Sequence, residues 1–461
     1  MAPARDDRNL AVRLGGAVAL FLLLVGQAQV TVLDGSSMLA VAHSLVHDGT
    51  LAVPPELGVA GHDGLFYSKY GLLLPLLASV PVALVQPIGA IAGRVDLLEA
   101  AAAASLMPLV CGALAAALFA LGRRLGAPRP AAALVGAGTV LGTYVLPYGR
   151  DFFTEPLVAL GLVVMVERAL ARRELQAGAA LALAVLARPQ SAVFAPLLLA
   201  FLALGDGDGL RAAARALAPL AAVAAVTVAY NLVRFADPLE FGYRPPVDPG
   251  FTTPLLGGTA GLLLSPEKSV VLFAPAIVLV PLAAVALWRR RRAIVALVLA
   301  LFAATWALAA TWHSWQGGWS WGPRLVIPGV VLALALVGPW IGTHATRLRV
   351  AALLFAAGFV LSFSAVLAPA GLQQLDRPTS DGPQLVRQYA EVPQLTRRSL
   401  RAARSTAARD DDYRRYLAPW QAGIMRQFGP WGLLPALLGT LALLAALVWV
   451  VRSLRPRLRP A

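Results

Sequence analysis

The sequence predicts an all-α polytopic membrane protein with about twelve transmembrane helices and a large first extracytoplasmic loop. Hydrophobic residues make up 58% of the 461 residues and charged residues only 14%, and the mean hydropathy is +0.71. Apolar runs long enough to cross a bilayer recur along the chain. A segment in lipid must satisfy its own backbone hydrogen bonds, which favours helices. Arginines cluster between these runs, as in proteins whose topology is set by cytoplasmic positive charge.

The order of the expected spans follows from this charge pattern. Arg5, Arg8 and Arg13 precede the first apolar run, so we expect the amino terminus inside. That run lacks a small-residue cleavage site and is expected to remain as the first helix. The segment 176–205 is compatible with one long bent helix or with a hairpin broken at Arg188-Pro189. The expected spans are 11–33, 97–122, 131–148, 155–170, 176–188, 191–205, 214–233, 269–288, 293–311, 324–343, 348–367 and 431–452.

A thirteenth apolar run, 71–93, is expected not to cross. With twelve spans every arginine cluster faces inward, whereas a crossing at 71–93 would turn all later clusters outward. The run contains Pro75, Pro81 and Pro87, which favour a broken, interfacial or re-entrant segment. We therefore expect residues 34–96 to form one outer loop with interfacial helices. The clusters lie at 123–129, 168–173, 211–215, 289–292, 347–349 and 452–459.

The expected organisation has three parts. Residues 1–367 form a transmembrane module, residues 368–430 an extracytoplasmic cap, and residues 431–461 the last transmembrane helix with a basic cytoplasmic tail. Arginine is used almost to the exclusion of lysine, and alanine is abundant, which suggests a high-GC bacterial genome. We therefore expect a multi-pass protein of a bacterial plasma membrane.

The net charge of +15 and the pI near 11.0 are compatible with nucleic-acid binding. The arginines, however, punctuate hydrophobic spans instead of forming one stripe among stacking aromatics. We therefore expect no nucleic-acid partner and membrane lipids around the spans. The single cysteine, Cys111, excludes an intramolecular disulfide and a cysteine metal site.

The polar groups that topology does not explain gather on the expected outer face. Asp34 follows the first span directly, where a carboxylate is costly unless it is hydrated, paired or functional. Asp34 is also compatible with an N-cap of a helix over 36–47, and the two roles do not exclude each other. His43 and His47 lie four residues apart with Asp48 adjacent, which is compatible with a divalent cation or with a pair of interfacial histidines.

Two further outer segments carry charge. Lys69 lies in a glycine-rich turn region, where it offers a compact cation at the membrane surface or merely snorkels to lipid headgroups. Arg150, Asp151 and Glu155 stand at the start of the span 155–170. Glu155 before a proline is equally compatible with a carboxylate that complements a helix N-terminus.

The outer segments 234–268 and 312–323 add Arg244, Lys268 and a tryptophan-rich loop that ends at Arg324. An interfacial aromatic belt would explain the tryptophans but not the other residues of the loop. The glycines of this loop and an arginine at the head of the next helix favour an aromatic wall for a sugar or isoprenoid, with Arg324 on a phosphate. The candidate binding residues of the loop are His313, Trp319, Trp321 and Arg324.

This layout resembles the GT-C superfamily of polytopic glycosyltransferases, which use polyprenyl-phosphate-linked sugars, and is similar to dolichyl-phosphate-mannose and aminoarabinose transferase-like bacterial proteins. Leu33-Asp34-Gly35 looks like the acidic start of the family's first outer loop, although many members have two adjacent acidic residues there. This departure puts in doubt a metal shared by such a pair. The other similar stretches are Ser68-Lys69-Tyr70-Gly71, where the family's two prolines do not follow the lysine, Arg150 to Glu155, and Gly317 to Arg324 with Pro328 beyond.

The resemblance implies a GT-C-like catalytic module that transfers a sugar, with inversion, from a polyprenyl phosphate to a hydroxyl of a glycan, lipid or protein acceptor on the outer face. Asp34 is then the expected general base, with Asp151 or Glu155 orienting the acceptor or substituting as the base. Lys69 and Arg324, together with Arg150, Arg244 or Lys268, are expected to bind the phosphate. The resemblance implies no certain cofactor and leaves a divalent cation open.

A transporter or flippase of a lipid-linked or anionic solute is the alternative, with the same cations along its path. Only the break at Arg188-Pro189-Gln190 favours it, because the two halves of the sequence show no internal correspondence. A scaffold without catalysis would leave the ionisable groups of the outer face unexplained.

Overall fold

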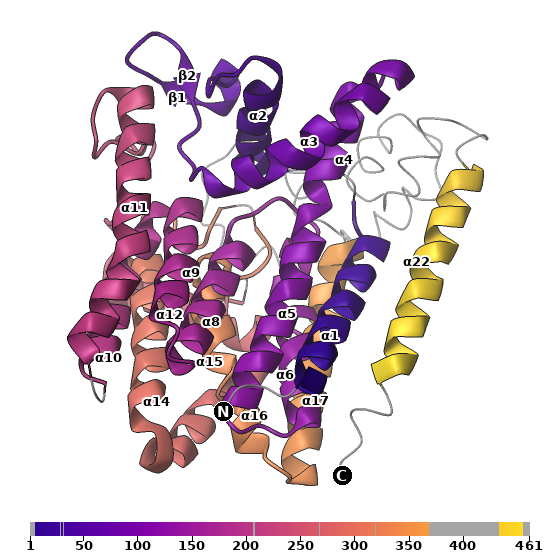
Figure 1. Ribbon diagram of the computed structural model, residues 1–461, viewed down its shortest axis with the longest axis vertical. Coiled ribbons are helices and arrows are strands. Elements are labelled where there is room, and N and C mark those ends of the chain that lie inside the picture. Colours follow the sequence, from indigo (N-terminus) through magenta and orange to yellow (C-terminus); the bar gives the residue numbers. More distant parts are fainter. Residues whose placement is uncertain are drawn as a thin grey trace.

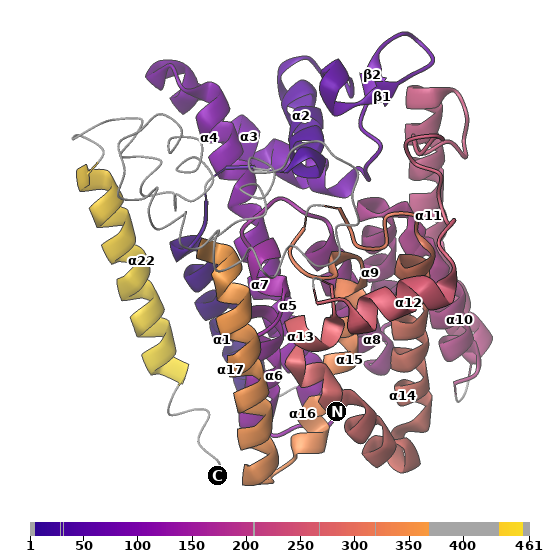
Figure 2. The ribbon, with the colours of Figure 1, turned by 180° about the vertical axis from the view of Figure 1, so that it is seen from behind.

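The computed structural model describes residues 5–27, 29–30, 32–205, 208–266, 268–318, 320–367 and 433–454. Within these residues the chain is a helical bundle with one small β-hairpin (Figures 1 and 2). The predicted cap, 368–430, lies outside the described residues. The α-helices of ten or more residues are α1 (Arg5–Leu24), α2 (Leu33–His47), α3 (Leu73–Ala92), α4 (Val95–Ala104), α5 (Leu106–Arg124), α6 (Arg129–Leu141), α8 (Glu155–Leu170), α9 (Glu174–Ala187), α11 (Gly209–Phe235), α12 (Leu255–Leu264), α14 (Val280–Thr311), α17 (Ala345–Leu367) and α22 (Leu433–Leu454).

Shorter elements connect and interrupt these helices. The strands β1 (Val59–Ala60) and β2 (Phe66–Tyr67) pair antiparallel. The short helices are α7 (Val145–Tyr148), α10 (Ala195–Ala203), α13 (Val270–Phe273), α15 (Ile327–Leu334) and α16 (Val337–Ile341), and the 3₁₀ turns are η1 (Pro55–Leu57), η2 (Pro189–Phe194), η3 (Pro275–Leu279) and η4 (Arg324–Val326).

The predicted class, a polytopic all-α membrane protein, is confirmed in its coarse form. In the part of the chain described, seven helical segments are long and apolar enough to cross a membrane, and four more apolar helices are shorter. The number of about twelve crossings stays a prediction. The seven segments are Leu73–Ala92, Val95–Arg124, Gly209–Phe235, Pro275–Thr311, Arg324–Ile341, Ala345–Val366 and Leu433–Leu454.

The expected interfacial run is a continuous helix. α3 spans 20 residues with Pro81 and Pro87 inside it, so the run is not broken. Both views show α3 at the end of the bundle that carries α2 and the hairpin, packed on α4 (Figures 1 and 2). Its composition alone would allow it to cross a membrane. Its expected place at the membrane surface stays a prediction.

Small residues let the bundle helices approach closely. Gly15 of α1 faces Gly112 of α5, and a Cβ on Gly15 would lie 2.6 Å from the Gly112 carbonyl oxygen. Backbone contact of this kind is typical of helix packing in membranes, where van der Waals fit drives association. α1 and α5 therefore form a tightly packed pair of helices.

Arginines pair with buried carboxylates near the start of α1. Asp7 of α1 accepts hydrogen bonds from Arg123 at 2.9 Å and from Arg129 at 2.7 Å. Glu167 pairs with Arg124 at 2.7 Å. α14 bends at Arg291, whose backbone is not helical, so two expected spans meet there in one kinked helix. Arginines of the 123–129 cluster thus pair with acidic residues of α1 and α8 at this end, and its cytoplasmic placement stays a prediction.

The segment 176–205 forms a hairpin rather than one bent helix. Arg188 has an extended backbone and separates α9 from η2 and α10. Gly178 near the start of α9 packs against Ala216 of α11, and Ala203 at the end of α10 packs against Gly209, the first residue of α11. The start of α9 and the end of α10 therefore lie near one end of α11, which places Arg188 toward the other end.

Candidate functional site

A cavity of about 660 Å³ lies at the α2 end of the bundle. Its walls come from α2, the segment before α3, the α9–η2 junction, residues 239–251 and the residues around the α14–η4 connection. One part is charged and another apolar, as in sites that take an amphiphilic ligand. The polar lining includes Asp34, Lys69, Arg188, Glu240, Asp248, His313 and Arg324. The apolar lining includes Val158, Phe194, Leu308, Ala309, Leu325 and Pro328.

Asp34 and Arg324 meet in this cavity although 290 residues separate them. Arg324 Nη1 donates to Asp34 Oδ2 at 2.8 Å. α2 begins at Leu33 without a side-chain cap, so Asp34 lies in the first turn and the N-cap interpretation is wrong. Burial opposes ionisation of Asp34, but the Arg324 charge and a hydrogen bond from Tyr70 outweigh it and hold the pKa of Asp34 below its usual value.

Glu155 lies behind the two guanidinium groups of the cavity. Its side chain is 2% exposed, and its Oε1 accepts from Arg188 Nη1 at 2.6 Å and lies 3.8 Å from Arg324 Nη1. Its Oε2 has no hydrogen-bond partner among the described residues. Glu155 does not itself line the cavity, but it contacts Arg188 and Arg324, which do. A buried carboxylate of this kind fixes the position of its cations.

The sequence analysis did not assign Arg188 to the site. It interpreted Arg188-Pro189 only as a helix break. The missed signal was topological, because the expected span 176–188 runs outward and therefore ends on the same face as Asp34. The break allows the Arg188 side chain to leave α9 and reach Glu155.

Lys69 lies on another wall of the same cavity and is already paired. Its Nζ donates to Asp248 Oδ2 at 2.5 Å and lies 5.0 Å from the centre of the Tyr243 ring. His313 Nε2 lies 3.6 Å from the other oxygen of Asp248. Asp248 was also missed from the sequence, since it stands in a loop without a recognisable motif. It joins the predicted residues Lys69 and His313 into one polar wall.

The segment that carries Lys69 is held by buried contacts. Arg234 is 2% exposed and donates to the Ser68 carbonyl, while Ser37 of α2 donates to the Ser68 hydroxyl at 2.8 Å. A Cβ on Gly71 would lie 2.2 Å from the Ala187 carbonyl oxygen, so only glycine fits there. Lys69 is thereby fixed between α2 and the end of α9.

Lys268 and Trp321 lie outside the cavity lining and support the loop before η4. Lys268 is 1% exposed, and its ammonium group donates to the backbone carbonyls of Ser320 and, at 3.2 Å, of Gly322. Trp321 is 5% exposed and packs edge-to-face on Phe273. Both therefore shape the turn that presents Arg324. Trp319 lies outside the described residues.

Three other candidates also lie outside the cavity lining. Arg150 is buried and donates to the Val25 carbonyl at 2.5 Å, and burial lowers the pKa of its guanidinium to about 10. Asp151 Oδ1 accepts from the Phe152 amide at 2.9 Å. Arg244 is 48% exposed and pairs with Glu240 at 3.2 Å. Their expected roles with acceptor and phosphate have no support from this placement.

The aromatic wall of the cavity comes from neighbours of the predicted residues. Tyr243 and Phe251 each pack edge-to-face on Trp312, with ring centres 5.5 and 5.1 Å apart. Burial is the main cause that raises the pKa of Tyr243 to about 12, so this phenol stays neutral and can act only as a hydrogen-bonding partner near neutral pH. All three line the cavity beside His313. An aromatic wall of this kind suits a sugar face.

Within the described residues, one group of side chains has the geometry to hold a metal ion. It consists of His43, His47 and Glu99, and it includes neither Asp48 nor a residue of the cavity lining.

Solved structures with the same architecture are known. The chain matches ArnT from Cupriavidus metallidurans bound to undecaprenyl phosphate, with a TM-score of 0.56 and 13% identity over 96% of this chain and 76% of that one. It matches the archaeal oligosaccharyltransferase AglB from Archaeoglobus fulgidus, in complex with an inhibitory peptide and a dolichol-phosphate, with a TM-score of 0.51 and 12% identity over 92% of this chain and 58% of that one. The chain therefore shares the fold of these two proteins. No protein-family model and no curated protein sequence matches it.

Proposed function

We propose that this protein is an integral-membrane glycosyltransferase that moves a sugar from a polyprenyl-phosphate carrier to an acceptor hydroxyl. The observation that carries the proposal is the cavity itself. It brings Asp34, Lys69 and Arg324 together beside apolar residues, in a fold shared with proteins whose solved structures contain undecaprenyl phosphate or dolichol-phosphate. A phosphate headgroup suits the cations, and the first part of an isoprenoid chain suits the apolar residues.

The apolar part of the cavity comes from α8, η2, α14 and α15, through residues such as Val158, Phe194, Leu308 and Pro328. No residue of α3 belongs to it. The carrier chain would therefore leave the charged wall between these bundle helices, and not under α3 as its apolar sequence suggests.

In the proposed reaction the acceptor oxygen attacks the anomeric carbon, and the bond from that carbon to the phosphate oxygen breaks. The acceptor proton passes to the Asp34 carboxylate, which is ionised because Arg324 and Tyr70 keep its pKa low. The leaving phosphate carries the charge that develops, and Arg324 and Lys69 stabilise it. Glu155 positions Arg324 and Arg188 from behind. The reacting groups face the extracytoplasmic side if the arginine-rich end is cytoplasmic.

The helix break that favoured a transporter or flippase has another explanation in this fold. The Arg188-Pro189-Gln190 break lies in the wall of the cavity with Asp34, where Arg188 pairs with Glu155. The break thus serves the same charged site.

The test compares transfer with binding. Purified protein in lipid nanodiscs is incubated with a panel of undecaprenyl-phosphate sugars and with cell-envelope acceptor fractions, and released undecaprenyl phosphate is quantified. We expect release by the wild type and none by Asp34→Asn, which keeps the shape of the side chain and loses its basicity. Asp96→Asn, an exposed carboxylate on α4, is the matched control. Undecaprenyl phosphate binding should persist in both variants.

Two results would contradict the proposal. If Asp34→Asn released undecaprenyl phosphate at the wild-type rate, Asp34 could not be the general base. Movement of the intact donor across a vesicle membrane without release of the phosphate would favour transport.

A further inference from the structure

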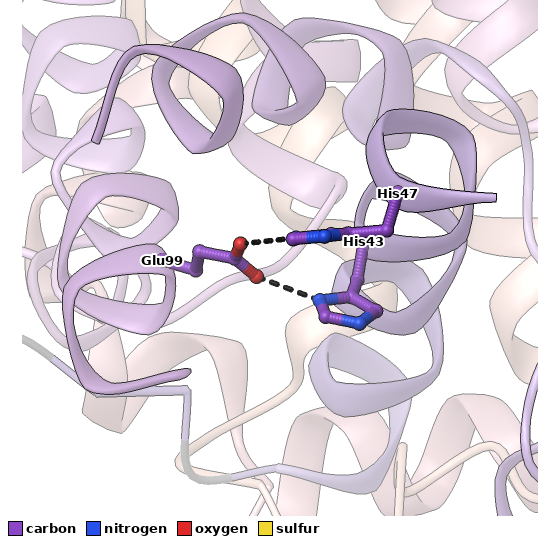
Figure 3. A group of neighbouring side chains, drawn as sticks. All are labelled: His43, His47 and Glu99. Carbon is purple, nitrogen blue, oxygen red and sulfur yellow. Dashed lines mark hydrogen bonds and ion pairs between the residues drawn. The ribbon is translucent and has the colours of Figure 1, made fainter. Parts of the chain in front are cut away.

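His43, His47 and Glu99 form a cluster that the proposed transfer reaction does not use. His43 and His47 are four residues apart on α2 and therefore lie on one face of that helix. Glu99 comes from α4, and Figure 3 shows both imidazoles directed at its carboxylate. His43 Nδ1 lies 2.7 Å from Glu99 Oε2, and His47 Nε2 lies 2.7 Å from Glu99 Oε1.

The charge of Glu99 has no lysine or arginine partner among the described residues. Its side chain is 3% exposed, and its ion-pair contacts are to the two histidines. A buried carboxylate is costly unless cations or several donors surround it. The two rings stack with centres 4.2 Å apart, and each presents one nitrogen to the same carboxylate. A single cation shared by all three side chains would satisfy that carboxylate.

We propose that His43, His47 and Glu99 bind a Zn²⁺ ion. The ligand atoms lie within 4.8 Å of one another, so small side-chain movements bring them to Zn–N and Zn–O distances of about 2.0 to 2.2 Å. Two imidazole nitrogens and one carboxylate oxygen are a ligand set that zinc favours. The His43 side chain is 43% exposed, which leaves room for water as a fourth ligand.

A neighbour in α3 completes the arrangement. The Gln86 side-chain nitrogen lies 3.3 Å from His47 Nδ1. When His47 Nε2 binds a metal, Nδ1 carries the ring proton and needs an acceptor. The amide oxygen of Gln86 would supply it once the amide is rotated by 180°, which exchanges its oxygen and nitrogen. Ligands from α2 and α4 and this outer partner from α3 would thus tie three helices together.

The zinc site is separate from the reaction centre. His43 follows Asp34 by nine residues on α2, which corresponds to about 14 Å along the helix axis. The ion therefore contacts no reacting atom. Its expected effect is to fix α2, the helix that presents Asp34, against α4.

The test uses full-length protein stripped with EDTA and titrated with Zn²⁺ by calorimetry, with metal content measured after desalting. We expect one Zn²⁺ per chain in the wild type, an affinity at least tenfold lower in Glu99→Gln and His47→Ala, and an unchanged affinity in His344→Ala. His344 is an exposed histidine outside the cluster. Co²⁺ in place of Zn²⁺ should give the visible absorption of a low-coordinate site in the wild type and not in Glu99→Gln.

The titration of the wild type tests the proposal even if a variant fails to fold. Absence of a stoichiometric high-affinity Zn²⁺ site in the wild type overturns the proposal, whatever the variants do. A wild-type affinity retained by Glu99→Gln also overturns it. Because each readout measures metal and not transfer, the result is independent of the proposed glycosyltransferase activity.

Discussion

Replacing Arg188 by methionine tests the charge arrangement of the cavity most directly. The change keeps much of the side-chain length and removes the guanidinium that lies 2.6 Å from Glu155 Oε1. The remaining partner, Arg324, lies 3.8 Å from the same oxygen. At an effective dielectric constant of about 20, these separations correspond to gross attractions of about 6 and about 4 kcal/mol. Glu155 is 2% exposed, so water cannot replace the lost partner.

Removal of one member of a buried ion pair costs about 3–5 kcal/mol of unfolding free energy, because the other charge stays buried without compensation. The Arg188 side chain is itself 22% exposed, so we expect the lower end, about 3 kcal/mol. Adding Glu155→Gln removes the uncompensated charge, and the double variant should regain most of the lost stability. Transfer should also fall in Arg188→Met, since the unpaired Glu155 carboxylate would hold Arg324 back from the donor phosphate.

The assay is unfolding in mixed micelles of increasing SDS content, followed by tryptophan fluorescence. Arg211→Met is the matched control, because its pair with Asp208 is 76% and 75% exposed and should contribute less than about 1 kcal/mol. The reasoning is refuted if Arg188→Met is no more destabilised than Arg211→Met. It is refuted equally if the double variant is less stable than the single one.

Three further results follow from the same contacts. Asp34 acts as a base only when it is ionised. Its pKa is low in the free protein, so kcat/KM for the donor should stay level as the pH falls through the range in which an ordinary aspartate titrates. Tyr70→Phe removes a hydrogen bond that lowers this pKa, so its kcat/KM should fall at a higher pH than that of the wild type; coincident profiles would contradict this. Lys69→Met should weaken binding of undecaprenyl phosphate about tenfold in a lipid-binding titration, since one charge-assisted hydrogen bond is lost; unchanged affinity would remove Lys69 from the phosphate site. Lys268→Met should cost about 1–3 kcal/mol in the SDS assay, because backbone carbonyls of the loop before η4 lose a buried donor; a neutral result would show that the loop keeps its shape without the ammonium group.

The charge pattern was sufficient to bring distant residues to one site. Counting spans so that every arginine cluster faces one side placed Asp34, Lys69 and Arg324 at the opposite end, and all three line one cavity. This part of the site was predictable because charge asymmetry orients whole segments, so an error of a few residues at a helix end does not change the side on which a loop lies. The expected first span, 11–33, illustrates such an error, since α1 ends at Leu24 and a second helix begins at Leu33.

The exact partners could not be predicted in the same way. Lys268 and Trp321 looked like binding groups because they stand in outer segments, yet both are buried against the backbone or other rings. Arg188 looked like a helix break, yet it lines the cavity. Asp248 stands in an irregular loop, where no periodicity assigns a direction to a side chain. Which face a loop residue presents depends on contacts far apart in the sequence, and no local pattern encodes them.

Arg324 links the parts of the site, because one guanidinium serves two carboxylates and, in the proposed reaction, a phosphate. While Arg324 donates to Asp34, the carboxylate is ionised but a weak base. A donor phosphate that attracts Arg324 would withdraw the strongest influence that lowers the pKa of Asp34, and the carboxylate would become more basic when the sugar is in place. Arg188 keeps Glu155 neutralised during this exchange, so Arg324 is not held back by a second unpaired charge. The arrangement therefore couples donor binding to activation of the base through a single side chain.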